Sequence, residues 1–310
     1  MERIDIENRT MVTEFIILGL SANPQLQIPL LLVFFPIYLI TLLGNLVIII
    51  VVCAEPHLHT PMYFFLSNLA LTDICYTSTI IPKLLGILLS GVNTVSYAGC
   101  LTQLYFFLGS AGVEIFLLTA MAYDRYVAIC HPLRYPHIIN WRVCILMAAA
   151  CWISAFLNSM PTTVFFSRLS FCGSNKIDHF FCDLSPLLKL SCTDTASIET
   201  LILLDGSFTS LLPFLLTIIS YIYIISAILR IRSAGGRRKA FSTCSSHLTV
   251  VSIFYVSIFC VYLTPASAFS LGLGKILSVF YTAVTPMLNP LIYTVRNQEV
   301  KQALRKPFGK

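Results

Sequence analysis

The sequence predicts an all-α membrane protein: a bundle of seven transmembrane helices, followed by a short amphipathic helix. Of the 310 residues, 57% are hydrophobic and only 11% are charged, and the mean hydropathy is +0.83. A water-soluble domain could not bury so many apolar side chains, whereas a protein with several membrane spans exposes them to lipid. The length accommodates seven spans of the roughly 20 apolar residues that cross a hydrocarbon layer, with short loops between them.

The chain is predicted to form one membrane domain without a separate soluble module. Residues 1–25 are polar, and residues 26–294 carry the spans. Residues 295–310 include alternating basic and apolar residues, as expected of a short helix lying on the inner leaflet. The predicted spans cover about residues 27–52, 61–89, 100–121, 143–166, 197–231, 239–262 and 271–293.

Basic residues are distributed unequally between the two sides of these spans. Thirteen of the twenty Lys and Arg residues fall in the loops assigned to the cytoplasm and in the C-terminal tail. By the positive-inside rule, this bias places the N-terminus outside the cell. The net charge of +6 is scattered over the ends of the spans, so it indicates contact with membrane lipid and not with nucleic acid.

The N-terminal segment carries two further signals. It lacks the pattern of a cleaved secretory signal, so the first span is expected to act as its own signal. The sequon Asn8-Arg9-Thr10 lies on the predicted outer side, where it is either an N-glycosylation site or a chance occurrence.

Several carboxylates lie inside the predicted spans, where an ionisable group marks a functional site. Asp73 and Glu114 could share a proton, be satisfied by hydroxyl groups, or hold a cation between them, since hard cations prefer oxygen ligands. Asp205, in the outer half of the fifth span, could orient an alcohol or amine group of a ligand. It could equally be protonated or exposed to water at the edge of the membrane. The pair Asp124-Arg125 ends the third span and could simply reach water at the interface.

The polar segment 167–196 is too long for a turn and is expected to form an ordered extracellular lid. It contains Cys172, Cys182 and Cys192, and Cys100 lies on the same side. Four thiols in an oxidising compartment allow three pairings, between which spacing alone cannot choose. The other seven cysteines fall in spans or on the inner face, where the reduced state is expected.

Two other classes of protein share some of these features. A transporter or channel also has intramembrane acids and a helix broken by proline, here at Pro290, but the sequence shows no internal repeat. An enzyme is disfavoured, because His57 and His59 have no third ligand at metal spacing, and His179 is not placed as a base for Cys182.

Four stretches of the sequence carry a resemblance to a known family. They are PMYFFLSNLALTDICYTSTIIPKLL in the second span, MAYDRYVAICHPLRY after the third, KAFSTCSSHLTVV in the sixth and PMLNPLIY in the seventh. In this order they resemble the odorant receptors, a branch of the rhodopsin-like G-protein-coupled receptors. The resemblance implies a plasma-membrane receptor that binds a small volatile odorant and activates the olfactory stimulatory heterotrimeric G protein, raising cAMP. A rhodopsin-like receptor for a peptide or metabolite is the second interpretation.

The resemblance also implies roles for individual residues. In the family, the arginine at Arg125 is held by the neighbouring acid at rest and is released on activation. The family pattern implies the disulfides Cys100–Cys182 and Cys172–Cys192, and a sodium ion at Asp73 with Glu114 as a second acid. The residues implied in the switch and in G-protein coupling are Asp124, Arg125, Tyr126, Tyr221, His247, Asn289, Pro290 and Tyr293.

The expected ligand pocket lies among the third, fifth, sixth and seventh spans, beneath the lid. A ligand there would act by binding one state of the bundle more tightly than the other, favouring the state in which the sixth span swings outward. Counting from the matched motifs, the expected pocket residues are Phe107, Leu108, Ala111, Gly112, Asp205, Gly206, Thr209, Tyr255, Ile258, Phe259, Tyr262, Val279 and Thr282. Most are apolar, as a site for a small hydrophobic molecule requires, although each could be an ordinary packing residue.

Overall fold

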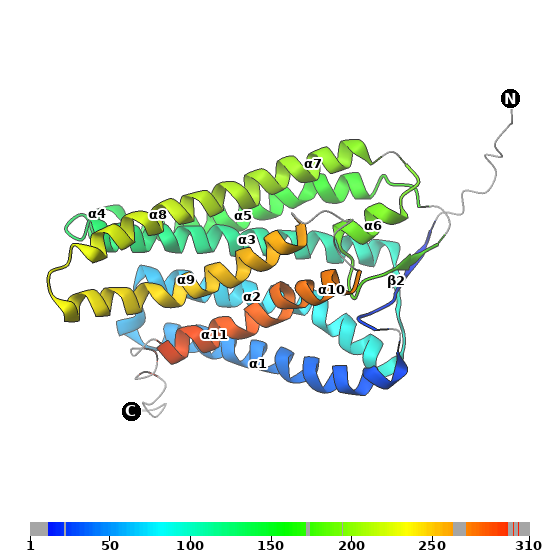
Figure 1. Ribbon diagram of the computed structural model, residues 1–310, viewed down its shortest axis with the longest axis horizontal. Helices are drawn as coiled ribbons and strands as arrows, with labels where there is room; N and C mark the ends of the chain where they lie inside the picture. Colours follow the sequence, from blue (N-terminus) through cyan, green and yellow to red (C-terminus); the bar gives the residue numbers. More distant parts are fainter. Residues whose placement is uncertain are drawn as a thin grey trace, which may run out of the picture.

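A computed structural model of the chain describes residues 12–21, 23–171, 174–193, 195–262 and 271–296, together with residues 300 and 303. Asn8 and Cys172 lie outside the described residues, and so does almost all of the predicted C-terminal helix. The described part is a bundle of long helices lying side by side, with a small sheet at one end (Figure 1).

The long helices are α1 (Gln27–Ala54), α2 (Pro61–Ser90), α3 (Tyr97–Cys130), α5 (Trp141–Phe166), α7 (Ala196–Gly206), α8 (Leu212–Leu229), α9 (Ala234–Tyr262), α10 (Leu271–Val279) and α11 (Thr285–Arg296). Two π-helical segments, η3 (Ser207–Leu211) and η4 (Phe280–Val284), join α7 to α8 and α10 to α11. The short helices are η1 (Pro24–Leu26), η2 (Pro56–Leu58), α4 (Tyr135–Ile138) and α6 (Leu184–Leu190).

Six helical segments in the described part are long and apolar enough to cross a membrane. A shorter apolar stretch, His247–Cys260, lies within α9. The chain is therefore a helical membrane bundle, as its composition predicts. The six segments are Pro24–Ala54, Pro61–Ser90, Tyr97–Cys130, Trp141–Phe166, Ala196–Leu229 and Gly274–Tyr293.

Local sequence signals set several helix ends. Ser96 accepts a hydrogen bond from the N–H of Gly99 at the start of α3, and Asn140 accepts one from Val143 at the start of α5. Pro61 opens α2, where its missing N–H costs nothing. Gly91 ends α2 with a left-handed backbone, φ 69°, which glycine adopts without strain.

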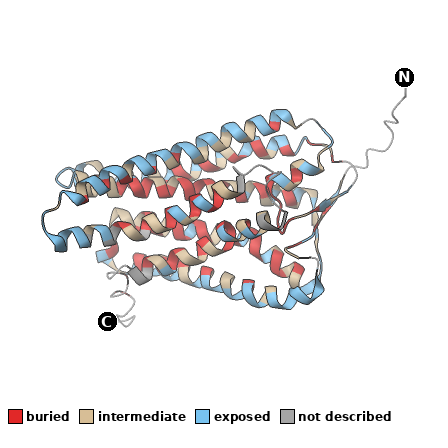
Figure 2. Cartoon of the chain, viewed as in Figure 1, coloured by how far each residue is buried: buried red, intermediate tan, exposed pale blue. Residues whose placement is uncertain are grey.

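The bundle is organised around α3. In the most apolar part of α3, 67% of the residues are buried, against 28% in α1 and in α5. Figure 2 shows buried residues concentrated on the inward faces, while the outer helices carry exposed residues along their length. Large apolar side chains such as Leu43 and Leu146 are exposed, which is the arrangement expected of helices that face lipid.

Glycines bring neighbouring helices into close contact. A Cβ at Gly109 of α3 would lie 2.6 Å from the ring of Phe156 on α5, and one at Gly112 would lie 3.0 Å from the Cβ of Ala155. Small residues at helix interfaces allow backbones to approach closely in membranes. These contacts fix α5 against α3 along the part of α3 that carries expected pocket residues.

A three-stranded sheet covers one end of the bundle and was not predicted. Strand β1 (Glu14–Ile17) pairs antiparallel with β2 (Thr94–Ser96) and parallel with β3 (Lys176–Ile177). The N-terminal segment therefore joins the loop between α2 and α3 to the predicted lid.

Candidate ligand cavity and switch

A cavity of about 320 Å³ lies between α3, α5, α7, η3 and α9, beneath α6 of the lid. This volume is at the lower end of the roughly 300–1,000 Å³ that is usual for small-molecule sites. Nine of the thirteen expected pocket residues line it: Phe107, Leu108, Ala111, Gly112, Asp205, Gly206, Thr209, Ile258 and Phe259.

Three expected pocket residues do not line the cavity. Tyr255 is buried against Phe214 and Phe259, with ring centroids 4.9 and 5.7 Å away. Val279 and Thr282 lie at the π-helical segment η4, and the hydroxyl of Thr282 donates to the carbonyl of Ser278. The fourth, Tyr262, has its side chain outside the described part of the structure.

The π-helical turn accounts for the displaced residues on the last span. A π-turn closes its hydrogen bond over five residues instead of four, so counting along a regular α-helix from the PMLNPLIY motif loses register at η4. One extra residue rotates the helix face by roughly 100°. Tyr281, which was not expected in the pocket, lines the cavity instead.

Twelve further residues line the cavity, and five of them come from elements that the expected pocket did not include. Asn158 and Ser159 lie on α5, and Leu184 lies in the lid. A polar residue such as Asn158 within an apolar span is the one sequence signal that could have indicated this wall. The other unexpected lining residues are Tyr76, Ile115, Ala155, Ile202, Leu203, Ser207, Ser210, Leu211 and Tyr281.

Asp205 is held by a partner from another helix. The side-chain amide of Asn158 on α5 donates a hydrogen bond to its carboxylate. The carbonyl of Asp205 also accepts a hydrogen bond from the Thr209 hydroxyl at 2.6 Å. The acid is half-buried and lies immediately before the π-helical segment η3.

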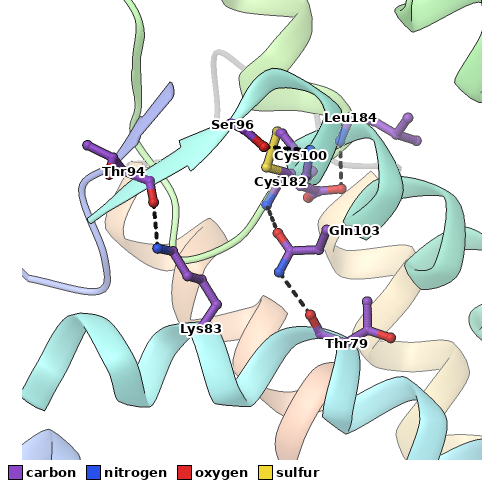
Figure 3. The surroundings of a disulfide bond; sticks show 10 residues. Thr79, Lys83, Thr94, Ser96, Cys100, Gln103, Cys182 and Leu184 are labelled. Carbon is purple, nitrogen blue, oxygen red and sulfur yellow. Dashed lines mark hydrogen bonds between the residues drawn. A yellow bond between two sulfur atoms is a disulfide. The ribbon is translucent and has the colours of Figure 1, made fainter. Parts of the chain in front are cut away.

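The lid is fixed to the bundle by a disulfide and by one side chain (Figure 3). Cys100 at the start of α3 is bonded to Cys182. Gln103, one turn further along α3, accepts a hydrogen bond from the N–H of Cys182 and donates one to the carbonyl of Thr79 on α2, each 2.9 Å long. Cys192 is also disulfide-bonded.

A second set of contacts ties the lid to the last span. Lys275 on α10 lies 2.6 Å from the carboxylate of Asp178 and donates to the carbonyl of Gly19 at 3.0 Å. His179 is buried and stacks on Phe180, with ring centroids 4.7 Å apart. Burial, reinforced by the charge of Lys275, lowers the pKa of His179 to about 3. The imidazole is therefore neutral in the folded lid.

The two intramembrane acids are both fully buried but differ in their partners. Asp73 accepts hydrogen bonds of 3.1 and 3.0 Å from the amide of Asn289 on α11. Both carboxylate oxygens of Glu114 are buried without a hydrogen-bond partner among the described residues.

The C-terminal end of α3 brings the first of the expected switch residues together. Arg125 donates two hydrogen bonds, 2.6 and 3.0 Å long, to the carboxylate of Asp124. Tyr135 of α4 donates to the other oxygen of Asp124 at 2.7 Å. Asp124 is fully buried, so the acid is engaged from two sides and holds Arg125 beside it.

The other expected switch residues surround this pair. Tyr126 shares a hydrogen bond of 3.2 Å with His131, and Tyr221 on α8 shares one of 2.5 Å with His247 on α9. The hydroxyl of Tyr293 is buried with no hydrogen-bond partner in the described part of the chain. Pro290 packs close to Gly44 of α1.

The described residues offer no metal centre of the kind that enzymes use. In the described ranges, no three His, Cys, Asp or Glu side chains are grouped so that they could hold a metal ion. His57 binds Glu55 at 3.1 Å, and His59 lies 3.3 Å from the carbonyl of Cys53. Both histidines are therefore loop residues with local partners.

Comparison with known proteins assigns the family. The family model described as olfactory receptor matches residues 34–310. The chain is 53% identical to olfactory receptor 5B21 of Homo sapiens over 305 residues, which are 98% of each chain. It is 51% identical to olfactory receptor 1G1 of Gorilla gorilla gorilla over 300 residues, covering 97% of this chain and 96% of the relative. The chain therefore belongs to the olfactory receptor family, and it is an odorant receptor of the plasma membrane and not an enzyme.

Proposed function

We propose that this receptor binds a small volatile odorant in the cavity beneath the lid and activates the olfactory stimulatory heterotrimeric G protein, raising cAMP. The observation that carries the proposal is the position of the cavity on α3. Gly112 lines the cavity and Arg125 lies thirteen residues further along the same helix, which is roughly 20 Å. A single rigid element thus connects the ligand site with the arginine expected to meet the G protein.

In this proposal the bundle crosses the membrane seven times, with α9 as the remaining span. The apolar stretch His247–Cys260 of α9 continues in the sequence with Val261, Tyr262 and Leu263. Together these residues approach the roughly 20 that a span requires. The charge bias of the loops places the N-terminus outside, so that Asn8 can accept an N-glycan.

Activation is a shift between two arrangements of the inner ends of α8 and α9. At rest, the bond from Tyr221 to His247 joins α8 to α9, and Asp124 holds Arg125. A ligand that binds the open arrangement more tightly moves α9 outward and frees Arg125. The size of the shift equals the difference in the ligand's binding free energy between the two states.

A sodium ion fits the residues around Asp73. The unpaired, buried oxygens of Glu114 and the buried, unpaired side-chain oxygen of Asn289 are hard oxygen ligands without hydrogen-bond partners among the described residues. Asp73 accepts bonds from the Asn289 amide, which fixes that side chain in place. When bound, the cation would supply positive charge to two carboxylates that burial makes costly. Asp73, Glu114 and Asn289 would hold it.

The test is a screen of volatile compounds on cells that carry the receptor and the olfactory stimulatory G protein, with cAMP as the readout. We expect at least one compound to raise cAMP in a dose-dependent way. Arg125→Ala should abolish that response while the receptor still reaches the cell surface, as measured by labelling an extracellular tag. A full response from a surface-expressed Arg125→Ala receptor would contradict the proposed switch.

A further inference from the structure

Five polar residues of the cavity lining lie on α5, on α7 and on η3, and we call them the polar pole: Asn158, Ser159, Asp205, Ser207 and Thr209. Most of the other lining residues are apolar, including Phe107, Leu108, Ile115, Ile258 and Phe259, and the remaining polar ones are Tyr76, Ser210 and Tyr281. A ligand in this cavity therefore meets most of the hydrogen-bonding groups along α5, α7 and η3, and mainly apolar side chains elsewhere.

The hydroxyl hydrogens of the polar pole are already engaged. Ser159 donates to the carbonyl of Phe156 at 2.9 Å, and Ser207 donates to the carbonyl of Leu203 at 2.7 Å. Thr209 likewise donates to the carbonyl of Asp205. Each of these hydroxyls has one hydrogen, so what it can still offer a ligand is its acceptor oxygen.

The charged member of the pole is also an acceptor with capacity left. One carboxylate oxygen of Asp205 accepts from the Asn158 amide. The other oxygen accepts no hydrogen bond from the described residues, and it is not enclosed by protein. The lining contains no Lys, Arg or His in the described part of the chain. Donors that remain are the Ser210 hydroxyl, the second amide hydrogen of Asn158 and the Tyr76 hydroxyl, which has no hydrogen-bond partner among the described residues.

We propose that the Asp205–Asn158 pair selects odorants that carry a hydrogen-bond donor, an alcohol or an amine, at one end of an apolar skeleton. This inference rests on the proposed function of the cavity. The unpaired oxygen of Asp205 accepts the ligand's O–H or N–H, and Asn158 orients the carboxylate across the gap between α5 and α7. A ligand whose polar group only accepts hydrogen bonds, such as an aldehyde or an ether, cannot bond to this oxygen.

The expected discrimination is large because a buried hydrogen bond to a charged group is among the stronger ones. Losing such a bond, and leaving the Asp205 oxygen without a partner, should weaken potency about tenfold or more. The two compounds of a matched pair have the same apolar skeleton. Its contribution to the binding free energy is therefore the same for both and does not affect the difference in potency.

The experiment compares compounds that differ only at the functional group. Cyclohexylmethanol, cyclohexylmethylamine, cyclohexanecarbaldehyde and cyclohexylmethyl methyl ether form one series, and the four benzyl counterparts form a second. Dose responses are measured as cAMP in cells with matched surface labelling. We expect the alcohol or the amine of a series to be about tenfold or more as potent as the aldehyde and the ether. A response to the amine, which is a cation at neutral pH, would indicate an ionised Asp205.

Two variants locate the effect. Asp205→Asn exchanges a carboxylate oxygen for an amide donor of the same shape, so it should lower the potency of the donor compounds and narrow the gap to the aldehyde. Glu199→Gln is the matched control, because Glu199 lies on the same helix, is exposed and does not line the cavity. It should leave the ranking of the compounds unchanged.

The outcomes separate this inference from the proposed function. An aldehyde or ether as potent as its alcohol and amine partners, or a ranking that Asp205→Asn leaves intact, overturns the inference while the receptor still answers to odorants. Agonists found only among compounds without a donor overturn it too. If no volatile compound raises cAMP, the proposed function fails as well. Should Asp205→Asn fail to reach the surface, the ranking on the unmodified receptor decides alone.

Discussion

Replacing Gln103 by leucine tests whether the lid depends on more than its disulfide. Gln103 lies on α3 beside Cys100 and joins three elements: its own helix, the carbonyl of Thr79 on α2 and the N–H of Cys182 in the lid. Leucine fills a similar volume but can neither donate nor accept. Gln103→Leu therefore removes both bonds and leaves the disulfide Cys100–Cys182 in place.

The two lost bonds should differ in cost. The backbone N–H of Cys182 belongs to a fully buried residue, and leaving it unpaired should cost about 1–3 kcal/mol. The carbonyl of Thr79 lies within α2 and keeps its helical bond, so losing a second partner should cost about 0.5–1.5 kcal/mol. The sum is about 1.5–4.5 kcal/mol of stability, concentrated where the lid meets α2 and α3.

The assay is thermal unfolding of the purified receptor in lipid nanodiscs, with surface expression as a second readout. The control is Thr102→Val on the same helix, because Thr102 is exposed and its hydroxyl makes no hydrogen bond in the described residues. We expect Gln103→Leu to lower the apparent melting temperature by about 3 °C or more and Thr102→Val to leave it unchanged. Equal melting temperatures for both variants would refute the assignment of Gln103 as a tether of the lid.

Three further predictions follow from other parts of the structure. Gly109→Ala should destabilise the receptor by about 1–3 kcal/mol, because its new Cβ would lie 2.6 Å from the ring of Phe156. Gly86→Ala, which has open space around it, should be neutral or slightly stabilising in the same thermal assay. Lowering the pH from 6.5 to 5 should destabilise the lid by about 2 kcal/mol through His179. The pKa of His179 is about 3 in the folded protein and 6.5 in the unfolded chain, so only the unfolded chain takes up a proton in this pH range. His179→Phe should remove that part of the slope in melting temperature against pH. Asp124→Asn should raise cAMP without ligand, since it weakens the bonds that hold Arg125 at rest; basal cAMP at or below that of the unmodified receptor would contradict this role.

The helices could be predicted from the sequence because their signals are local. Apolar runs of the required length mark the spans, and Ser96, Asn140 and Gly91 mark helix ends within a few residues of where they occur. The sheet could not be predicted in this way. Strand β1 has only four residues, and its partners begin at Thr94 and Lys176, so its pairing depends on the bundle having brought those loops together.

Some of the cavity residues also could not be predicted from the sequence, because one irregular helical turn changes which side chains face the cavity. Residues on α3 could be placed by counting, because α3 is a regular helix from its matched motif to the cavity. On the last span, η4 adds a residue to one turn, and the count then names Val279 and Thr282 where Tyr281 lines the wall.

The polar pole depends on a relation between helices that no single stretch of sequence contains. Asp205 is conspicuous in the sequence as an acid within a span, but its partner comes from α5, which carries none of the four matched motifs. Asn158 meets Asp205 where α5 contacts α7, and α5 is also in close contact with α3 at Gly109 and Gly112, where a larger side chain would force the helices apart. The specificity proposed for the cavity is therefore set in part by two glycines, one of which, Gly109, does not line the cavity. If that reasoning holds, Gly109→Ala should alter the preference for donor ligands as well as stability, because moving α5 separates Asn158 from the carboxylate that it orients.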